Sequence, residues 1–415
     1  MATVKNKNAH MKSCSTYTDN ENHFLVDSRY EIVRVLGKGS YGVVCSAIDT
    51  KSSSSGMEHK IAIKKVTKIF NKDILLIRAI RELKFMMFFR GHRNIATLLD
   101  LDVVYVKPYE GLYCFQELAD LDLARVLYSN VQFSEFHIQS FMYQILCGLK
   151  YIHSADVIHR DLKPGNILVT TQGTLKICDF GLARGINPNY FKNRSPTITN
   201  YVATRWYRAP ELIMSTKNYT KAVDIWAVGC ILGELFGRRP LFPGKNSHEQ
   251  IHELFKILGN PPMETIKKYN WKVEGLLWVK YRPVKWKSLY PFAPPDAISL
   301  LEKLLKWDYK ARLEVEEILA QSFFKSLRNM NEEPASKSIF DFSFEERNRT
   351  VAQLKEVLEG EVKFFKETCK TKAENGESGK KLKKNHDLTP GISNQLTNSG
   401  KELLCTICNN RNVLP

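Results

Sequence analysis

Residues 157–168 read V-I-H-R-D-L-K-P-G-N-I-L, and residues 176–181 read K-I-C-D-F-G. Together they match the pattern H-R-D-L-x-x-x-N followed by D-F-G. Transfer of a metal-bound phosphoryl group needs carboxylate and amide oxygens for Mg²⁺, and a separate carboxylate near the attacking hydroxyl. Asp179 and Asn166 suit the metal role, and Asp161 suits the role of the base. Any one of them alone could instead cap a helix or occupy a turn, so the interpretation depends on further motifs.

Upstream, a glycine-rich segment lies between two predicted strands. Residues 37–44 read G-K-G-S-Y-G-V-V, and glycines there would let the backbone approach phosphate oxygens closely. Alone, the segment could be a plain hairpin turn, or a dinucleotide fingerprint if a helix followed it. A strand follows instead, which disfavours the dinucleotide interpretation.

Residues 60–66, K-I-A-I-K-K-V, predict a third strand that carries Lys64 inside an apolar segment. A buried lysine needs a counter-charge, because desolvation lowers its pKa and favours the neutral form. Glu82, in a helix predicted at residues 74–88, can supply that charge and leave a fixed ammonium for nucleotide phosphates. A surface lysine on an edge strand would explain this pair equally well in isolation. Four motifs in this order, however, rarely arise together by chance.

The order of the predicted elements divides the chain into two unequal lobes. A small sheet with one helix comes first, and mostly helical segments such as residues 136–153 and 222–236 follow. We expect a disordered arm at residues 1–28, a small lobe at 29–118, a large lobe at 119–326, an extension at 327–366 that packs back on the small lobe, and a disordered basic tail at 367–415.

Residues 30–326 resemble a eukaryotic protein kinase. The resemblance implies an α+β, bilobal fold: a small antiparallel β-sheet lobe with one regulatory helix, and a larger, mainly α-helical lobe. It implies ATP and Mg²⁺, with the nucleotide beneath the glycine loop and Lys163 steadying the transferred phosphoryl group. It also implies a buried ion pair between Glu211 and Arg312 that anchors the end of the activation segment, residues 179–211. The residues that it assigns to ATP binding are Leu36, Gly37, Lys38, Gly39, Ser40, Tyr41, Gly42, Val43, Val44, Ala62, Lys64, Glu82, the hinge residues Gln116, Glu117, Leu118 and Ala119, and Asp122 at the expected ribose contact.

Residues 197–211, T-I-T-N-Y-V-A-T-R-W-Y-R-A-P-E, narrow the resemblance. They are similar to the activation lip of mitogen-activated protein kinases, whose threonine and tyrosine, here Thr199 and Tyr201, are both phosphorylated; ordinary loop hydroxyls are the alternative. A phosphate adds about −1.5 to −2 charges at pH 7 and can order a loop by pairing with arginines. The resemblance implies that phosphothreonine meets Arg81, Arg160 and Arg184, and that phosphotyrosine meets Arg205 and Arg208, which would also help form a pocket for a proline after the target serine or threonine.

Residues 71–86 and 143–168 resemble, within that family, the sporulation-specific kinases of budding yeasts, which are linked to spore-wall assembly. The sequence departs from the commoner family forms at Asn200 in T-N-Y, which leaves the upstream activator open, and at Gly165, where a serine is usual. Family members also grip basic peptides with an acidic docking patch. Residues 328–334, R-N-M-N-E-E-P, keep two glutamates there but have Asn329 where an aspartate is typical, so we expect weak docking.

The composition is that of an ordinary globular protein, with 43% hydrophobic and 25% charged residues among 415. No apolar run approaches the roughly 18 residues of a membrane helix, and the N-terminus lacks a secretory signal, so we expect a cytosolic or nuclear protein. The nine cysteines are scattered, and we expect reduced, buried thiols at Cys147, Cys178 and Cys230. Cys405 and Cys408 have metal-ligand spacing but no second pair of ligands.

Other classes of function are less well supported. A net charge of +17 would permit binding to nucleic acid, but the basic residues are dispersed apart from a cluster at 380–384, so we expect no dedicated site. Intact Lys64, Asp161, Asn166 and Asp179 oppose a non-catalytic scaffold with a kinase fold, and a kinase activated by a cyclin-like subunit gives no reason for Tyr201. We therefore expect a monomeric enzyme whose partners are protein substrates with Ser-Pro or Thr-Pro sites and an upstream activating kinase.

Overall fold

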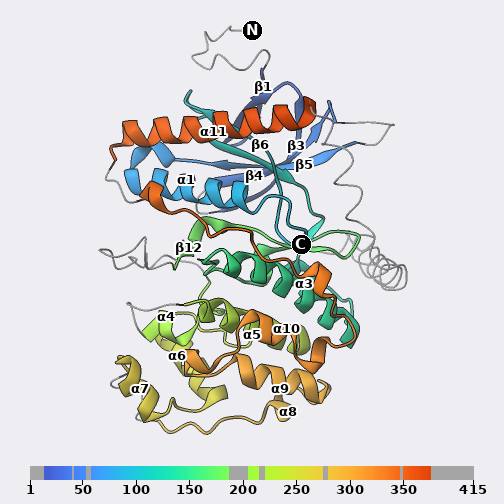
Figure 1. Ribbon diagram of the computed structural model, residues 1–415, viewed down its shortest axis with the longest axis vertical. Helices are drawn as coiled ribbons and strands as arrows, with labels where there is room; N and C mark the ends of the chain where they lie inside the picture. The colour runs from blue at the N-terminus through green and yellow to red at the C-terminus, as the bar shows by residue number, and fades with distance from the viewer. Residues whose placement is uncertain are drawn as a thin grey trace. The chain divides into compact units, whose positions relative to one another are not determined.

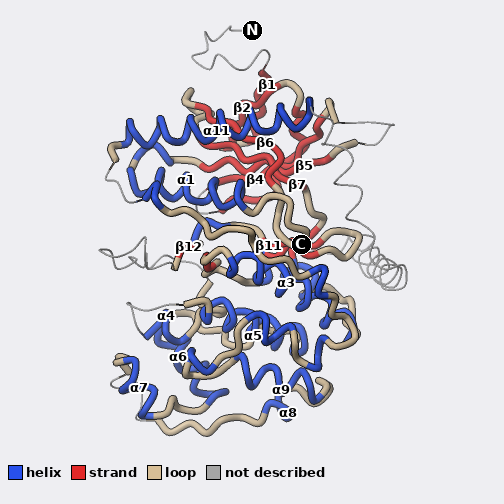
Figure 2. The backbone as a smooth tube through the Cα atoms, viewed as in Figure 1, coloured by secondary structure: helices blue, strands red, loops and turns tan. Residues whose placement is uncertain are grey.

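The computed structural model describes residues 14–39, 42–52, 58–186, 204–214, 220–273, 279–345 and 349–374. The chain forms two compact units. With the gaps just given, residues 14–91, 96–118 and 349–374 belong to unit 1, and residues 92–95 and 119–345 belong to unit 2. Unit 1 is built on a sheet and unit 2 is mainly helical, which confirms the expected α+β fold (Figure 1 and Figure 2).

Unit 1 contains a five-stranded antiparallel sheet in the order β3-β4-β5-β7-β6, with a separate hairpin, β1-β2. The strand that carries Lys64, β5, is central, so its apolar neighbours are buried. The elements of unit 1 are β1 (Cys14–Asp19), β2 (Asn22–Asp27), β3 (Tyr30–Gly39), β4 (Gly42–Asp49), β5 (Lys60–Val66), α1 (Asp73–Phe88), β6 (Leu98–Val104), β7 (Gly111–Glu117) and α11 (Val351–Glu374).

The hairpin β1-β2 shows that the expected disordered arm at residues 1–28 is wrong for Cys14–Asp27. Phe24 and Val26 alternate along β2 and are 0% and 1% exposed in the core of unit 1, which also contains Tyr113. Burial of these side chains offsets the entropy that the hairpin loses on ordering. The residues around Phe24 and Val26 are mostly polar, so the sequence alone did not predict a strand from this short apolar alternation.

Helix α11 packs on α1 and β6, and Figure 1 shows it lying alongside α1. Its anchoring contacts include an ion pair between Lys84 and Glu361 at 2.5 Å and the guanidinium of Arg90 over the ring of Phe365 at 4.9 Å. An apolar stripe holds the helix as far as Phe365. The helix continues to Glu374, so the expected disordered tail from residue 367 is wrong as far as that residue. The buried stripe is Leu354, Leu358, Val362 and Phe365.

The extension expected at residues 327–366 does not pack on the small lobe as one piece. Its first part, as far as Glu345, belongs to unit 2, and only the helical part joins unit 1. Phe340 donates its backbone N–H to the carbonyl of Ala155 at 3.0 Å. The ring of Phe342 covers Gly185, where an added Cβ would come within 2.2 Å of the ring. Aromatic packing on a glycine therefore keeps this part of the extension in unit 2.

Unit 2 is organised around α5, which is buried along most of its length and contains the fully buried Trp226. Three short antiparallel strands, β11-β10-β8, and the pair β12-β9 carry the segments between the helices. The elements of unit 2 are β8 (Leu121–Asp122), α2 (Leu123–Leu127), α3 (Glu135–Ser154), β9 (Val157–Ile158), β10 (Ile167–Val169), β11 (Leu175–Ile177), β12 (Arg184–Gly185), α4 (Pro210–Met214), α5 (Ala222–Gly237), α6 (Ser247–Leu258), α7 (Met263–Tyr269), α8 (Trp286–Leu289), α9 (Pro295–Leu304) and α10 (Val315–Leu319).

Two of the three cysteines expected as buried thiols are buried in the part of the chain that the structure describes. Cys147 and Cys230 are buried free thiols, whereas Cys178 is only partly buried. Within these ranges, no helix combines the length and the apolar character needed to cross a bilayer. Cys405, Cys408 and the lysines at 380–384 lie outside the described residues.

Candidate active site

Lys64 lies in unit 1 on the central strand β5, in register with Val44 of β4 and Cys114 of β7. Its Nζ lies 2.6 Å from Oε1 of Glu82 on α1, and the two side chains are 20% and 9% exposed. The predicted ion pair is therefore present.

The glycine segment lies where β3 meets β4, but its glycines have different neighbours. Among the residues that the structure describes, none has an atom within 4 Å of a Cβ added at Gly37, and one atom lies within 4 Å of a Cβ added at Gly39. Gly42 is different, because an added Cβ would lie 2.1 Å from the carbonyl oxygen of Lys65. Contact within the sheet is thus enough to require a glycine at position 42. Leu36, Lys38, Val43 and Val44 are in the paired strands, and Ser40 and Tyr41 lie outside the described residues.

The expected hinge begins at the end of β7. Glu117 is held inside unit 1, since its Oε1 accepts a hydrogen bond from the backbone N–H of Thr97 at 2.7 Å. Gln116 is in register with Ala62 of β5. The chain passes from unit 1 to unit 2 between Leu118 and Ala119, where the sequence predicted the boundary.

Asp122, the expected ribose contact, has a local structural role in unit 2. Its Oδ1 accepts a hydrogen bond from the backbone N–H of Arg125 at 2.9 Å, which caps helix α2. Its Oδ2 also lies 3.4 Å from Nε of Arg125. The capping role alone would account for an aspartate at this position.

Asp161, Lys163 and Asn166 form one cluster in unit 2. Oδ2 of Asp161 accepts hydrogen bonds from Nζ of Lys163 and from Nδ2 of Asn166, both at 2.8 Å. Nδ2 of Asn166 also donates to the backbone oxygen of Asp161 at 2.8 Å. Because the amide nitrogen is committed to Asp161, the amide oxygen is the atom that Asn166 can offer to a cation. Gly165 has no atom within 4 Å of an added Cβ, so the usual serine would fit there without a clash.

Asp179 adopts a left-handed backbone conformation, with φ 64° and ψ 77°. Its Oδ1 accepts a hydrogen bond from the N–H of Gly181 at 3.4 Å, and the preceding carbonyl, of Cys178, lies 3.1 Å from Nε2 of His159. Arg160 is also left-handed, with φ 66°. Non-glycine residues in this conformation store strain and cluster at functional sites.

The sequence analysis missed the residue that supports this loop, Asp224 of α5. Its carboxylate accepts hydrogen bonds from the backbone N–H groups of His159 and Arg160, both at 2.8 Å, and lies 2.8 Å from Nε2 of His153. Burial acts to raise the pKa of Asp224, but hydrogen bonds from His153 and His159 hold it below its usual value. The sequence feature that could have identified Asp224 is its position, as an acidic residue in the first turn of an otherwise mostly apolar helix.

Three of the arginines expected to bind phosphate lie close together in unit 2. Burial, and then the positive charge of Arg205, lower the pKa of Arg208; Asp161 opposes this effect and Arg160 adds to it. Nε of Arg205 is buried and has no hydrogen-bond partner within the described ranges. Gathered like charges favour binding of an anion. Arg184 lies on β12 and Arg81 on α1 of unit 1; Thr199 and Tyr201 lie outside the described residues.

The predicted pair of Glu211 and Arg312 is present and buried. Nη1 and Nη2 of Arg312 donate to the two carboxylate oxygens of Glu211 at 2.7 and 2.8 Å, and the side chains are 0% and 2% exposed. The guanidinium lies 4.9 Å from the ring centroid of Trp226. This bidentate pair fixes the end of the activation segment to the core of unit 2.

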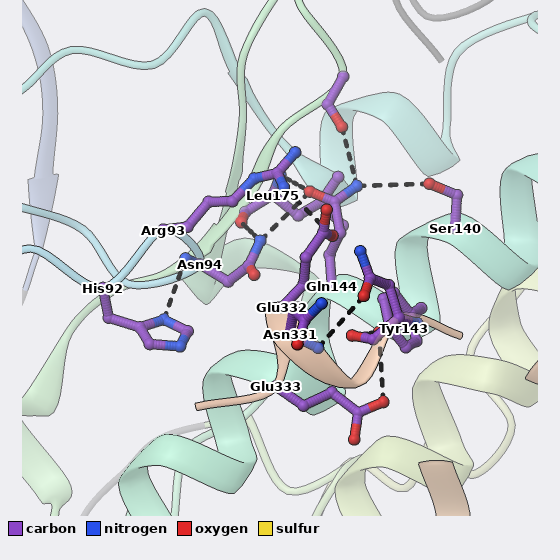
Figure 3. A network of polar contacts seen from close by, with 12 residues as sticks. His92, Arg93, Asn94, Ser140, Tyr143, Gln144, Leu175, Asn331, Glu332 and Glu333 are labelled. Atoms are coloured by element: carbon purple, nitrogen blue, oxygen red, sulfur yellow. Dashed lines mark hydrogen bonds and ion pairs between the residues drawn. The ribbon is translucent and has the colours of Figure 1, made fainter. Parts of the chain in front are cut away.

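The expected docking stretch is involved in a polar network that Figure 3 shows. Glu333 is 1% exposed at its side chain and lies 3.4 Å from Nζ of Lys150 and 3.1 Å from Nε of Arg328. Oε2 of Glu332 lies 3.3 Å from Nη1 of Arg93. Three cations therefore surround two carboxylates. In addition, the hydroxyl of Tyr143 donates to Glu333 at 3.2 Å and to the carbonyl of Asn329 at 3.0 Å.

The sequence of the chain is similar to those of known proteins. Residues 30–324 match the protein kinase domain. The chain is 54% identical over 347 residues to a sporulation-specific mitogen-activated protein kinase of Saccharomyces cerevisiae, a match that covers 81% of this chain and 88% of that protein. It is 44% identical over 361 residues to a mitogen-activated protein kinase of Cytospora mali, covering 86% of this chain and 84% of the relative. A second kinase of this type from Saccharomyces cerevisiae is 44% identical over 348 residues, 83% of this chain and 71% of that protein.

Proposed function

The chain belongs to the mitogen-activated protein kinases, a branch of the protein kinase family, and from this premise we propose that it phosphorylates serine or threonine residues that precede proline. As a member of this branch it is a serine/threonine protein kinase that uses ATP, acts on protein substrates and responds to upstream kinases. The observation that carries the catalytic part of the proposal is the cluster of Asp161, Lys163 and Asn166.

In the proposed mechanism, Asp161 orients the target hydroxyl and accepts its proton. Lys163 and Asn166 hold one oxygen of this carboxylate, so its orientation is set before the substrate binds. The positive charge of Lys163 would also steady the transferred phosphoryl group. Lys64, oriented by Glu82, would hold phosphate oxygens of ATP.

Asn166 and Asp179 would hold Mg²⁺, and one amide oxygen with one carboxylate fits that ion, which takes few protein ligands alongside phosphate oxygens. The bonds from Nδ2 of Asn166 to Asp161 support this assignment, because they commit the amide nitrogen and turn its oxygen to other partners. When bound, the ion would neutralise charge on the phosphates. Asp179 has a left-handed backbone conformation, and its carboxylate accepts a hydrogen bond from the N–H of Gly181.

We further propose that phosphorylation of Thr199 and Tyr201 activates the enzyme and that it acts in sporulation. The gathered Arg160, Arg205 and Arg208 support the first proposal, because an added phosphate would relieve their mutual repulsion. The similarity to a sporulation-specific kinase supports the second. Phosphopeptide mapping of protein from sporulating cells tests both, and high activity with Thr199 and Tyr201 unmodified would refute the switch.

The catalytic proposal is tested with the doubly phosphorylated protein and a peptide array that varies the residue after the target hydroxyl. We expect transfer to Ser-Pro and Thr-Pro peptides, and loss of transfer in Lys64→Arg and in Asp161→Asn. Lys60→Arg, on the same strand but 60% exposed at its side chain, is the matched control and should keep full activity. Full activity in either of the first two variants would refute the mechanism. Nucleotide binding without any phosphoryl transfer would instead identify a scaffold.

A further inference from the structure

A buried carboxylate in unit 2 has each of its oxygens bound by a different tyrosine. Glu234 lies on α5 and is 0% exposed. The hydroxyl of Tyr128 donates to Oε1 at 2.5 Å, and the hydroxyl of Tyr207 donates to Oε2 at 2.6 Å. The two tyrosines come from distant segments: Tyr128 follows α2, and Tyr207 lies in T-R-W-Y-R, residues 204–208.

The second of these segments carries both arginines that we propose to form the proline pocket. Arg205 and Arg208 flank Tyr207 in the chain, and the N–H of Arg208 donates to the carbonyl of Arg205 at 3.0 Å, which closes a tight turn. The orientation of this turn therefore determines where the two guanidinium groups point. The side chain of Tyr207 in this turn reaches Glu234 of α5.

A second helix, α6, holds the same turn through Gln250, which is 0% exposed. Its Oε1 accepts a hydrogen bond from the N–H of Gly244 at 3.1 Å, and its Nε2 donates to the carbonyl of Trp206 at 3.5 Å. Nε1 of Trp206 in turn donates to the carbonyl of Gly244 at 3.1 Å. The turn is therefore held at Trp206 by these two bonds, and at Tyr207 by the shorter bond to Glu234.

The hydrogen bond from Tyr207 to Glu234 is strong because its acceptor is a buried carboxylate. A buried carboxylate is stable only if hydrogen bonds replace its water, and bonds to a charged acceptor are stronger than neutral ones. Burial raises the pKa of Glu234, and the bonds from Tyr128 and Tyr207 oppose that rise. Burial and the charge of Glu234 raise the pKa of Tyr207, so its hydroxyl stays protonated and remains a donor.

We infer that Glu234 is a positioning residue for target recognition, which acts through Tyr207 on the turn that carries Arg205 and Arg208. This inference rests on the proposed proline-directed function. It assigns to Glu234 the positioning of the turn that recognises the proline. Glu234 and Tyr207 do not touch the reacting atoms. Their effect appears in the binding of the target peptide, and ATP binding is unaffected.

The two tyrosines provide a matched pair of variants, because Tyr207→Phe and Tyr128→Phe each remove one hydroxyl from the same carboxylate. The measurements are kcat and KM for a Ser-Pro and a Ser-Ala peptide, and KM for ATP, with the doubly phosphorylated full chain. Tyr207→Phe should raise KM for the Ser-Pro peptide about tenfold and lower the preference for proline by a similar factor, as expected for one lost bond to a charged group. Tyr128→Phe should stay within about twofold of the wild type.

The conservative variant Glu234→Gln keeps one acceptor oxygen and should show an intermediate loss of proline preference with unchanged KM for ATP. Thermal unfolding of each variant separates loss of fold from loss of recognition. Equal losses in Tyr207→Phe and Tyr128→Phe, or an unchanged peptide KM in Tyr207→Phe, would overturn the inference. A wild-type enzyme without preference for proline would refute the proposed function instead, and the peptide KM of Tyr207→Phe would still decide the positioning role.

Discussion

Replacing Glu211 by glutamine would leave the guanidinium of Arg312 buried without its counter-charge. The two side chains are 2% and 0% exposed, and two hydrogen bonds at 2.7 and 2.8 Å join them. Removal of one partner from a buried pair costs about 3–5 kcal/mol, because the other charge is left uncompensated. We expect Glu211→Gln to lower the free energy of unfolding by that amount.

Arg312→Met should cost more, because the guanidinium also serves two backbone carbonyls. Nε donates to the carbonyl of Lys306 at 3.0 Å, and Nη1 donates to that of Ala222 at 2.9 Å. At about 1 kcal/mol for each of these bonds, the variant should lose about 5–7 kcal/mol. The double variant with Glu211→Gln should cost less than the two losses combined, since no unpaired charge remains.

Calorimetric unfolding of the full chain measures these losses. For a unit of the size of unit 2, 1 kcal/mol corresponds to about 2–4 °C, so Glu211→Gln should lower Tm by roughly 6–20 °C. The control is Lys268→Gln, which removes an ion pair of similar length, 2.8 Å to Asp308, between side chains that are 48% and 30% exposed. Exposed pairs contribute about 0–1 kcal/mol, so a shift of at most about 4 °C is expected. A Glu211→Gln variant no less stable than this control would refute the reasoning.

Three further changes probe other features. Phe24→Ala should lower the free energy of unfolding by about 3–5 kcal/mol in denaturant titrations, because the ring is fully buried; a loss below about 1 kcal/mol would exclude the hairpin from the core. Burial lowers the pKa of Lys65 from 10.5 to about 8, so between these values the unfolded chain binds a proton that the folded chain has lost, and stability should rise with pH. Lys65→Met should remove that part of the rise, and an unchanged pH profile would contradict the assignment. A basic peptide should bind the wild type with Kd above about 1 mM by fluorescence polarisation, because Glu332 and Glu333 are already paired; micromolar binding that Glu332→Gln abolishes would show a working acidic patch.

Motif chemistry predicted the charged pairs of the site well. Lys64 with Glu82 was expected because a charge in an apolar strand needs a counter-charge, and Glu211 with Arg312 was expected from the resemblance to protein kinases. Both pairs are present. Asp224 and Glu234 were not expected as supports. Their partners lie between 27 and 106 residues away, and local periodicity carries no information about such contacts.

The ends of the ordered chain were the least predictable part of the fold. The hairpin at Cys14–Asp27 and the last turns of α11 are polar on average. Phe24 and Val26 are the buried side chains of the hairpin, and Arg90 contacts Cys369 in the last turns of α11. The sequence shows these side chains but not the surface that receives them. The roles of Thr199 and Tyr201, and a cytosolic or nuclear location, stay predictions.

Helix α11 covers α1 and β6. It is also the last described part of unit 1 to be translated. Val351, the first residue of α11, leaves the ribosome roughly 230 residues after Glu117 completes the sheet, which at about 5–20 residues per second is a delay of roughly 10–50 s. Until then, the apolar surface that Leu354 and Leu358 will cover stays open to water. The nascent chain therefore exposes an apolar surface, which favours aggregation, until α11 has emerged.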